Sequence, residues 1–198
     1  MRKLPLIPTI VVAAAIAVMI GLGIWQLGRA DEKAELLARY EAATDQPPVA
    51  WPSAPGDREA LLYRRASGFC TEVVGWRAVA GRSRSGQSGW SHVAGCRTGG
   101  LEGPGMQVDM GWSRDHHQPQ GWTGGEVSGV IGPDREHGIR LVSDGAAPGL
   151  EPSAAPTPTD IPNNHLMYAG QWFFFALVAG IIYLVALRRR VAAPADKA

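Results

Sequence analysis

The chain has 198 residues, a formal net charge of +1 and a hydrophobic fraction of 45%. These averages resemble those of a soluble protein, but they combine two apolar ends with a polar middle. The middle has no run of like charges and no basic patch interleaved with aromatic residues, which argues against nucleic-acid binding. It spans about 130 residues, enough for one domain with its own core.

The apolar run over 4–27 is uncharged and predicts a first transmembrane helix, since about 20 apolar residues cross a bilayer core. A cleaved signal peptide is the alternative, but the run exceeds the roughly 7–15 apolar residues of such a segment. No A-x-A-like cleavage site follows it. We therefore expect a retained anchor. Residues 28–46 keep helical spacing and predict an extension of this helix that Pro47-Pro48 ends.

Residues 60–148 predict a β-rich domain, because short runs with period-two character alternate with glycine clusters. The strands are expected over 61–70, 73–79, 90–96, 106–112 and 126–131, with a hairpin loop at 81–89. Short strands of this kind predict a small antiparallel sheet, barrel-like or sandwich-like. The fold class is therefore a membrane protein in which two transmembrane helices flank a β domain.

Residues 149–164 contain four prolines and predict an extended, semi-rigid connector. The run 166–187 predicts a second transmembrane helix, and 188–198 a cytoplasmic tail. Arg2 and Lys3 precede the first span and Arg188–Arg190 follow the second, so the positive-inside rule places both termini in the cytoplasm. No transit peptide precedes the first span, which favours a bacterial inner membrane with the central domain in the periplasm.

Two cysteines, Cys70 and Cys96, lie in the domain expected outside. Folding the predicted hairpin about residue 83 or 84 brings them roughly opposite each other, so a structural disulfide is one interpretation. Two small buried hydrophobic residues are the other. A copper site has less support, since no C-x-x-C spacing occurs. His116-His117 are expected in a loop or at the surface, and no enzyme motif is present.

In the first span Ala13, Ala17, Gly21 and Trp25 recur every four residues, and in the second Tyr168, Trp172, Ala176 and Gly180 do the same. Small residues at this spacing let helices approach closely. One hypothesis is that the two stripes face each other and splay at the outer membrane surface around His165. The alternative is an ordinary interfacial belt of aromatic residues.

Two end motifs carry a family resemblance. Gly23-Ile24-Trp25-Gln26-Leu27-Gly28-Arg29, followed by Lys33, and Asn164-His165-Leu166-Met167-Tyr168-Ala169, followed by Trp172, resemble those of the first surfeit-locus protein family, membrane-anchored assembly factors of haem-copper cytochrome c oxidase. Between them Tyr63-Arg64-Arg65, Gly111-Trp112 and Val127-Ser128-Gly129 fall in the expected order. The chain departs at Asp109-Met110, where the family usually has an asparagine-arginine pair.

The resemblance implies delivery or insertion of haem a into oxidase subunit I, with haem a synthase as a further partner and membrane lipid as the surroundings. It makes His165 the candidate ligand of the haem iron. Trp25, Tyr168 and Trp172 offer apolar faces, Gln26 belongs to the same motif, and Arg29 could pair with a propionate or anchor the helix. No enzymatic activity is expected. A membrane scaffold without haem and a periplasmic copper-handling protein remain as alternatives.

Overall fold

The computed structural model describes residues 5–52, 56, 58–99 and 105–192. It divides into a helical unit, with the chain up to Leu36 and from Pro162 onward, and a β unit from Leu37 to Ile161. Arg2, Lys3, the predicted start of the first span at residue 4 and the tail beyond residue 192 lie outside the described residues. The two units are each considered by themselves.

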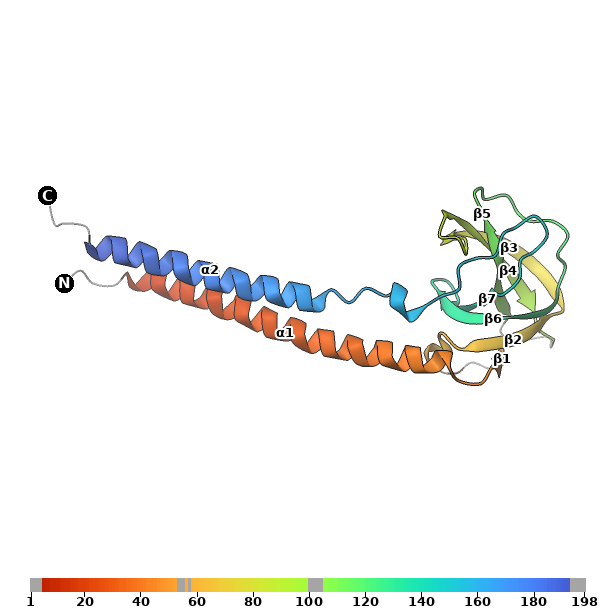
Figure 1. Ribbon diagram of the computed structural model, residues 1–198, viewed down its shortest axis with the longest axis horizontal. Coiled ribbons are helices and arrows are strands. Elements are labelled where there is room, and N and C mark those ends of the chain that lie inside the picture. Colours follow the sequence, from red (N-terminus) through yellow and green to blue (C-terminus); the bar gives the residue numbers. More distant parts are fainter. Residues whose placement is uncertain (1–4, 53–55, 57, 100–104, 193–198) are drawn as a thin grey trace. The chain divides into compact units, whose positions relative to one another are not determined.

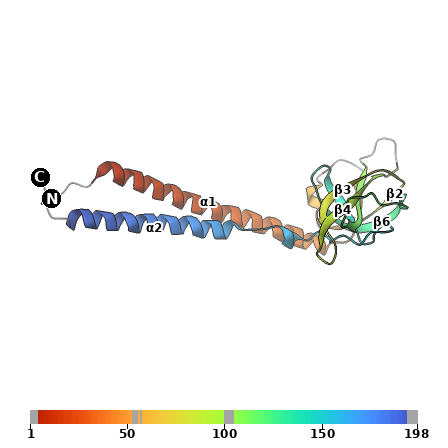
Figure 2. The same ribbon diagram turned by 90° about the horizontal axis from the view of Figure 1, so that it is seen from above.

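Two long helices dominate the helical unit. α1 runs from Leu6 to Thr44 without a break, so the predicted span and its extension are one helix. α2 runs from His165 to Ala192, past the predicted end of the second span. Both are long and apolar enough to cross a membrane. They lie side by side and antiparallel, the start of α1 beside the end of α2, in both views (Figure 1, Figure 2).

The β unit contains one seven-stranded sheet. Its strands are β1 (Val49–Ala50), β2 (Arg65–Cys70), β3 (Glu72–Arg82), β4 (Ser88–Arg97), β5 (Met106–Ser113), β6 (Gly125–Asp134) and β7 (Gly138–Ser143). The predicted hairpin loop is confirmed, because β3 and β4 pair antiparallel from Arg82↔Ser88 onward. β1 and β7 are strands that the sequence pattern did not reveal.

The sheet is mixed rather than purely antiparallel, which corrects the expectation. The strand order is β1-β2-β6-β7-β5-β4-β3, and β1–β2 and β5–β7 pair in parallel. The parallel β5–β7 pair arises because β6 and β7 form a hairpin that lies between β2 and β5. The core is built by inward residues of the central strands, with Val93, Val108, Ile131 and Leu141 fully buried.

The proline-rich connector is extended, as predicted, but it also packs along the sheet. Ser153 bridges to Ser83 and Glu151 to Trp112 in antiparallel fashion. A single 3-10 turn, Pro158–Asp160, interrupts the connector before it leaves the β unit. The connector is therefore part of the β unit's edge as well as a link to α2.

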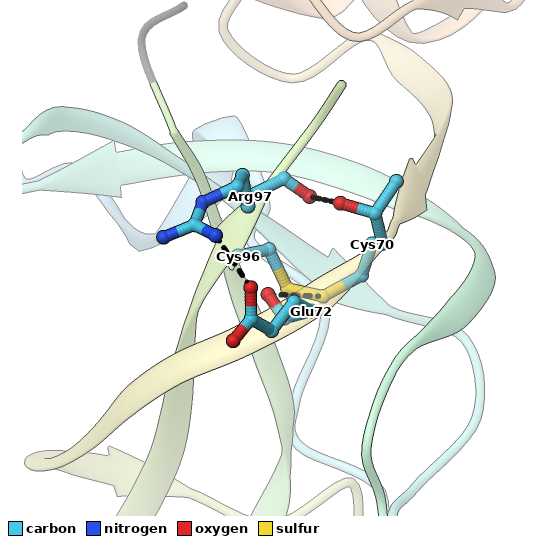
Figure 3. Close-up of a disulfide and its surroundings, with 5 residues drawn as sticks. Cys70, Glu72, Cys96 and Arg97 are labelled. Atoms are coloured by element: carbon cyan, nitrogen blue, oxygen red, sulfur yellow. Dashed lines mark hydrogen bonds and ion pairs between the residues drawn. A yellow bond between two sulfur atoms is a disulfide. The ribbon is translucent and has the colours of Figure 1, made fainter. Parts of the chain in front are cut away.

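A disulfide joins Cys70 and Cys96, so the first of the two interpretations of the cysteines is confirmed. Its geometry differs from the predicted hairpin pairing, since the β3–β4 register places Val73 opposite Cys96. Cys70 reaches Cys96 from the end of β2, where the chain turns at Thr71, whose N–H and hydroxyl both donate to the carbonyl of Arg97. Arg97 also pairs with Glu72 (Figure 3).

Candidate functional site

The two helices meet along a heptad-like face. On α1 the less exposed residues alternate three and four apart: Val12, Ile16, Met19, Gly23, Gln26 and Ala30. On α2 they do the same: His165, Ala169, Trp172, Ala176, Ala179 and Tyr183. This spacing averages close to 3.5 residues and keeps one face toward a partner helix. The contact face of the helical unit is therefore set by this pattern.

The hypothesis that the small-residue stripe of α1 faces α2 is wrong. Ala13, Ala17 and Gly21 are exposed, and Trp25 is 57% exposed. A stripe recurring every four residues drifts about 40° per step around a helix with 3.6 residues per turn, so it leaves the contact face within a few steps. On α2 the predicted stripe agrees better with the observed contact face, since Trp172 is half-buried and Ala176 is buried.

Gly23 is a point of close packing between the helices. A Cβ there would lie 2.6 Å from Cε1 of Phe173 and 2.8 Å from its Cζ. The aromatic ring of Phe173 on α2 thus lies directly on the α1 backbone at Gly23, and a side chain at this position would displace the ring. This contact lies one turn from Gln26, near the His165 end of the helix pair.

His165 contacts Gln26 across the pair. Its Nδ1 lies 2.8 Å from the side-chain carbonyl oxygen, Oε1, of Gln26. A carbonyl only accepts, so Nδ1 carries the proton and donates it. In its neutral form the ring then presents Nε2 with its lone pair free, and no described residue hydrogen-bonds Nε2. Gln26 therefore selects the tautomer and ring orientation that a metal ligand requires.

Asn163 adds a second polar contact at this end of the helical unit. Its Nδ2 donates to the backbone carbonyl of Ala30 over 3.4 Å. Its Oδ1 is buried and accepts no hydrogen bond from any residue that the structure describes. A buried acceptor without a partner costs free energy, so a donor from water or a ligand would be favoured there. Asn163 directly precedes the sequence motif, which begins at Asn164, and no pattern gave a reason to single it out.

The remaining predicted residues are placed differently. Trp25 points away from α2, and Arg29 forms an ion pair with Glu32 on its own helix. Tyr168 is 50% exposed and lines a shallow recess of about 540 Å³ on α2, one turn after His165. Trp172 packs edge-on against Phe175. Of the predicted set, only Gln26 contacts His165 directly.

The histidines of the β unit have structural partners. Nε2 of His92 lies 2.7 Å from Oγ of Ser113, which itself donates to the carbonyl of Asp115. Burial lowers the pKa of His92, so the ring is neutral. His116 and His117 lie in a loop, as expected, and their rings stack. Within the described residues no group of three or more His, Cys, Asp or Glu could hold a metal ion.

Sequence reasoning missed a buried charge cluster in the β unit. Asp109, marked earlier only as a departure from a family pattern, is buried and accepts hydrogen bonds from Ser153 (2.7 Å) and the N–H of Gly111 (3.2 Å). Burial raises the pKa of Asp109, and Arg140 opposes that shift. Ser153 and Arg140 come from distant segments, so no local pattern could have found their contacts with Asp109.

Two apolar helices of spanning length, a sheet domain between them in the sequence and a histidine hydrogen-bonded across the helix pair define a membrane-anchored protein with one folded β domain. The model of the SURF1 family matches residues 13–177. The chain belongs to that family, whose members are assembly factors for cytochrome c oxidase. No curated protein matches the chain closely enough to serve as a relative.

Proposed function

We propose that this protein assists delivery of haem a to, or its insertion into, subunit I of haem-copper cytochrome c oxidase, by binding haem transiently at the outer face of the membrane. The observation that carries the proposal is the His165–Gln26 hydrogen bond. It leaves Nε2 of His165 as a neutral imidazole donor, the form that ligates haem iron. Family membership supplies the assembly role.

The surroundings of His165 suit an amphiphilic cargo. Trp25, Tyr168 and Met167 expose apolar surface near the same end of the helical unit, and the recess beside Tyr168 is lined almost entirely by apolar atoms. The exposed guanidinium of Arg29 is held by Glu32 only, so it remains available to a propionate. A carrier must also release its cargo, and a single protein ligand makes release easier than a closed two-histidine site.

The proposed location is the bacterial inner membrane, with both termini in the cytoplasm and the β unit in the periplasm. Arg188–Arg190, near the C-terminal end of α2, support this orientation. The disulfide supports it independently, because disulfides persist in oxidising compartments such as the periplasm. Haem a synthase and subunit I are the proposed protein partners, within membrane lipid, and no enzymatic activity is proposed.

The test is to purify the full chain in detergent from cells that make haem a and to measure haem per protein by absorbance. His165→Ala should abolish haem binding. Gln26→Leu should reduce affinity about 10–100-fold, the usual effect of removing a partner that orients a ligand. Gln46→Leu is the matched control, because the Gln46 side chain is exposed, does not line the recess beside Tyr168 and has no hydrogen bond in the described structure. Its haem content should equal that of the native protein.

The alternatives give different results in the same experiment. A scaffold without haem predicts equal, low haem content in the native protein and in His165→Ala, and this outcome would defeat the proposal. A copper-handling protein predicts loss of oxidase activity in Cys70→Ser but not in His165→Ala. Both cysteines of the chain are in the disulfide, so neither is a thiolate ligand until it is reduced.

A further inference from the structure

The outer edge of β3 is an incompletely paired sheet edge. β3 is the last strand in the sheet order and pairs with β4 alone. At the C-terminal end of β3 the proline-rich connector is already hydrogen-bonded to this edge. The N–H of Arg84 donates to the Pro152 carbonyl (2.9 Å), and the N–H of Ala154 donates to the Arg82 carbonyl (2.8 Å). The chain therefore shows that this edge accepts an added antiparallel segment.

Open backbone groups continue along β3 before the connector. Backbone polar groups alternate sides along a strand. Since the Arg82 carbonyl points outward to Ala154, the N–H and C=O of Ala80 and Ala78 point outward as well. No described segment pairs with them. Natural sheets usually protect such edges by bulges or covering segments, and here a bulge after Val73 protects only the opposite end.

A cavity of about 620 Å³ lies against this open stretch. Four consecutive β3 residues, Arg77 to Ala80, line it. Successive strand residues point to opposite faces, so a lining that includes all four is made by the strand's edge. The other walls come from Trp90 and from the β6–β7 hairpin, at Pro133–Arg135 and Arg140. The volume is within the range of ligand-binding clefts.

Arg140 is ion-paired beside the cavity, but its donors are not hydrogen-bonded. Asp134 accepts a hydrogen bond from Arg77 (2.5 Å) and two from the backbone N–H groups of Glu136 and His137 (3.0 and 2.9 Å). These three bonds leave the Asp134 carboxylate little capacity for a further donor. Arg140 lies 3.6 Å from Asp134 and 3.7 Å from Asp109, within ion-pair distance but beyond hydrogen-bond distance.

Arg140 makes no hydrogen bond with any described residue, and its Nε is buried without a partner. Its side chain is 21% exposed and lines the cavity. A planar guanidinium with free donors is suited to bidentate pairing with a carboxylate. Arg135 is exposed on the same wall and adds positive charge.

We propose that the cavity along β3 binds an extended acidic segment of another polypeptide, which adds to the edge at Ala78–Ala80 and places a carboxylate on Arg140. Strand addition supplies main-chain hydrogen bonds, and side-chain pockets supply selectivity. A free small anion would use the arginine but not the open backbone, so the combination favours a peptide. The site lies wholly in the β unit and does not depend on the role of His165.

The probe is a short fluorescent peptide of alternating valine and threonine with a central glutamate, titrated against the full-length protein in detergent by fluorescence anisotropy. Saturable binding is expected. Replacing the glutamate by glutamine should weaken it about tenfold or more, the usual scale for one charge-assisted hydrogen-bonded pair. With Arg140→Gln the two peptides should bind equally. Arg97→Gln, an exposed arginine outside the cavity, is the matched control and should bind as the native protein does.

Ala80→Pro tests the edge while keeping every arginine. Its N–H points outward, so proline removes a donor for the added segment and none for β4. This variant should lose binding of both peptides at least about tenfold while its thermal unfolding stays near that of the native protein. Three results would overturn the proposal: no saturable binding at about 1 mM peptide, equal binding of both peptides by the native protein, or full displacement by equimolar acetate or by anionic-lipid vesicles.

Discussion

Removing the disulfide gives a quantitative test of the β unit. The bridge closes a loop with a sequence separation of 26, which contains all of β3 and most of β4. In the chain-entropy description, opening a loop of that size restores conformational freedom to the unfolded chain and lowers the free energy of unfolding by about 3.5 kcal/mol at 25 °C. For a domain of this size the corresponding fall in Tm is about 10–15 °C.

The assay is thermal unfolding of the full chain in detergent, followed by far-ultraviolet circular dichroism at the sheet signal. The double variant Cys70→Ala/Cys96→Ala and the native protein with reductant should both show the fall. The reduced native protein keeps both sulfur atoms in the core, so comparison with the variant separates the loop effect from lost packing. Reductant should leave the variant unchanged. A fall below about 1 kcal/mol in the reduced protein would refute the reasoning.

Three further predictions concern single positions. Gly129→Ala should prevent folding of the β unit or lower its free energy of unfolding by more than about 3 kcal/mol, because the added Cβ would lie 1.9 Å from a backbone carbonyl oxygen of β7. The measurement is protease resistance, and Gly75→Ala, where the added Cβ meets open space, is the control. Gly23→Val should separate the helices, unlike Gly21→Val at an open position, as read from cross-linking between introduced cysteines; equal cross-linking would contradict the packing. Burial lowers the pKa of His92, so the folded state binds fewer protons than the unfolded state and stability falls as pH drops below about 6.5. His92→Asn should flatten that part of the urea-unfolding stability profile, and an unchanged slope would assign the effect to another group.

The parts of the fold with a strong local signal were predictable from sequence. Both helices, the β3–β4 hairpin and the extended connector follow from uncharged runs, glycine clusters and prolines. β7 was missed because it is short and Arg140 interrupts its apolar residues, while its burial depends on β5 and β6 on either side. The parallel β5–β7 pair could not be predicted either, because it depends on where the β6–β7 hairpin lies in the sheet.

The candidate site was predictable in composition but not in arrangement. His165 and Gln26 were both identified from motifs. On α1, however, a stripe that recurs every four residues overlaps with a pattern that alternates three and four apart, and the pairing with α2 decides which of the two faces the partner helix. The every-fourth-residue stripe was the more visible one, and it is exposed. Asp109 on β5 and Arg140 on β7 are separated in sequence by the whole of β6, so their proximity is a property of the folded sheet.

The polar contacts at the two ends of the helix pair have a consequence for alignment. Thr9 hydrogen-bonds Tyr183 near one end, and Gln26 hydrogen-bonds His165 near the other. Nearly equal numbers of residues separate the two partners on each helix, so both bonds form together in one axial register. Sliding one helix by a turn, about 5.4 Å, would break both at once. The two hydrogen bonds therefore fix the axial alignment of the helices. Thr9, near the far end of the pair, helps in this way to set the axial position of His165.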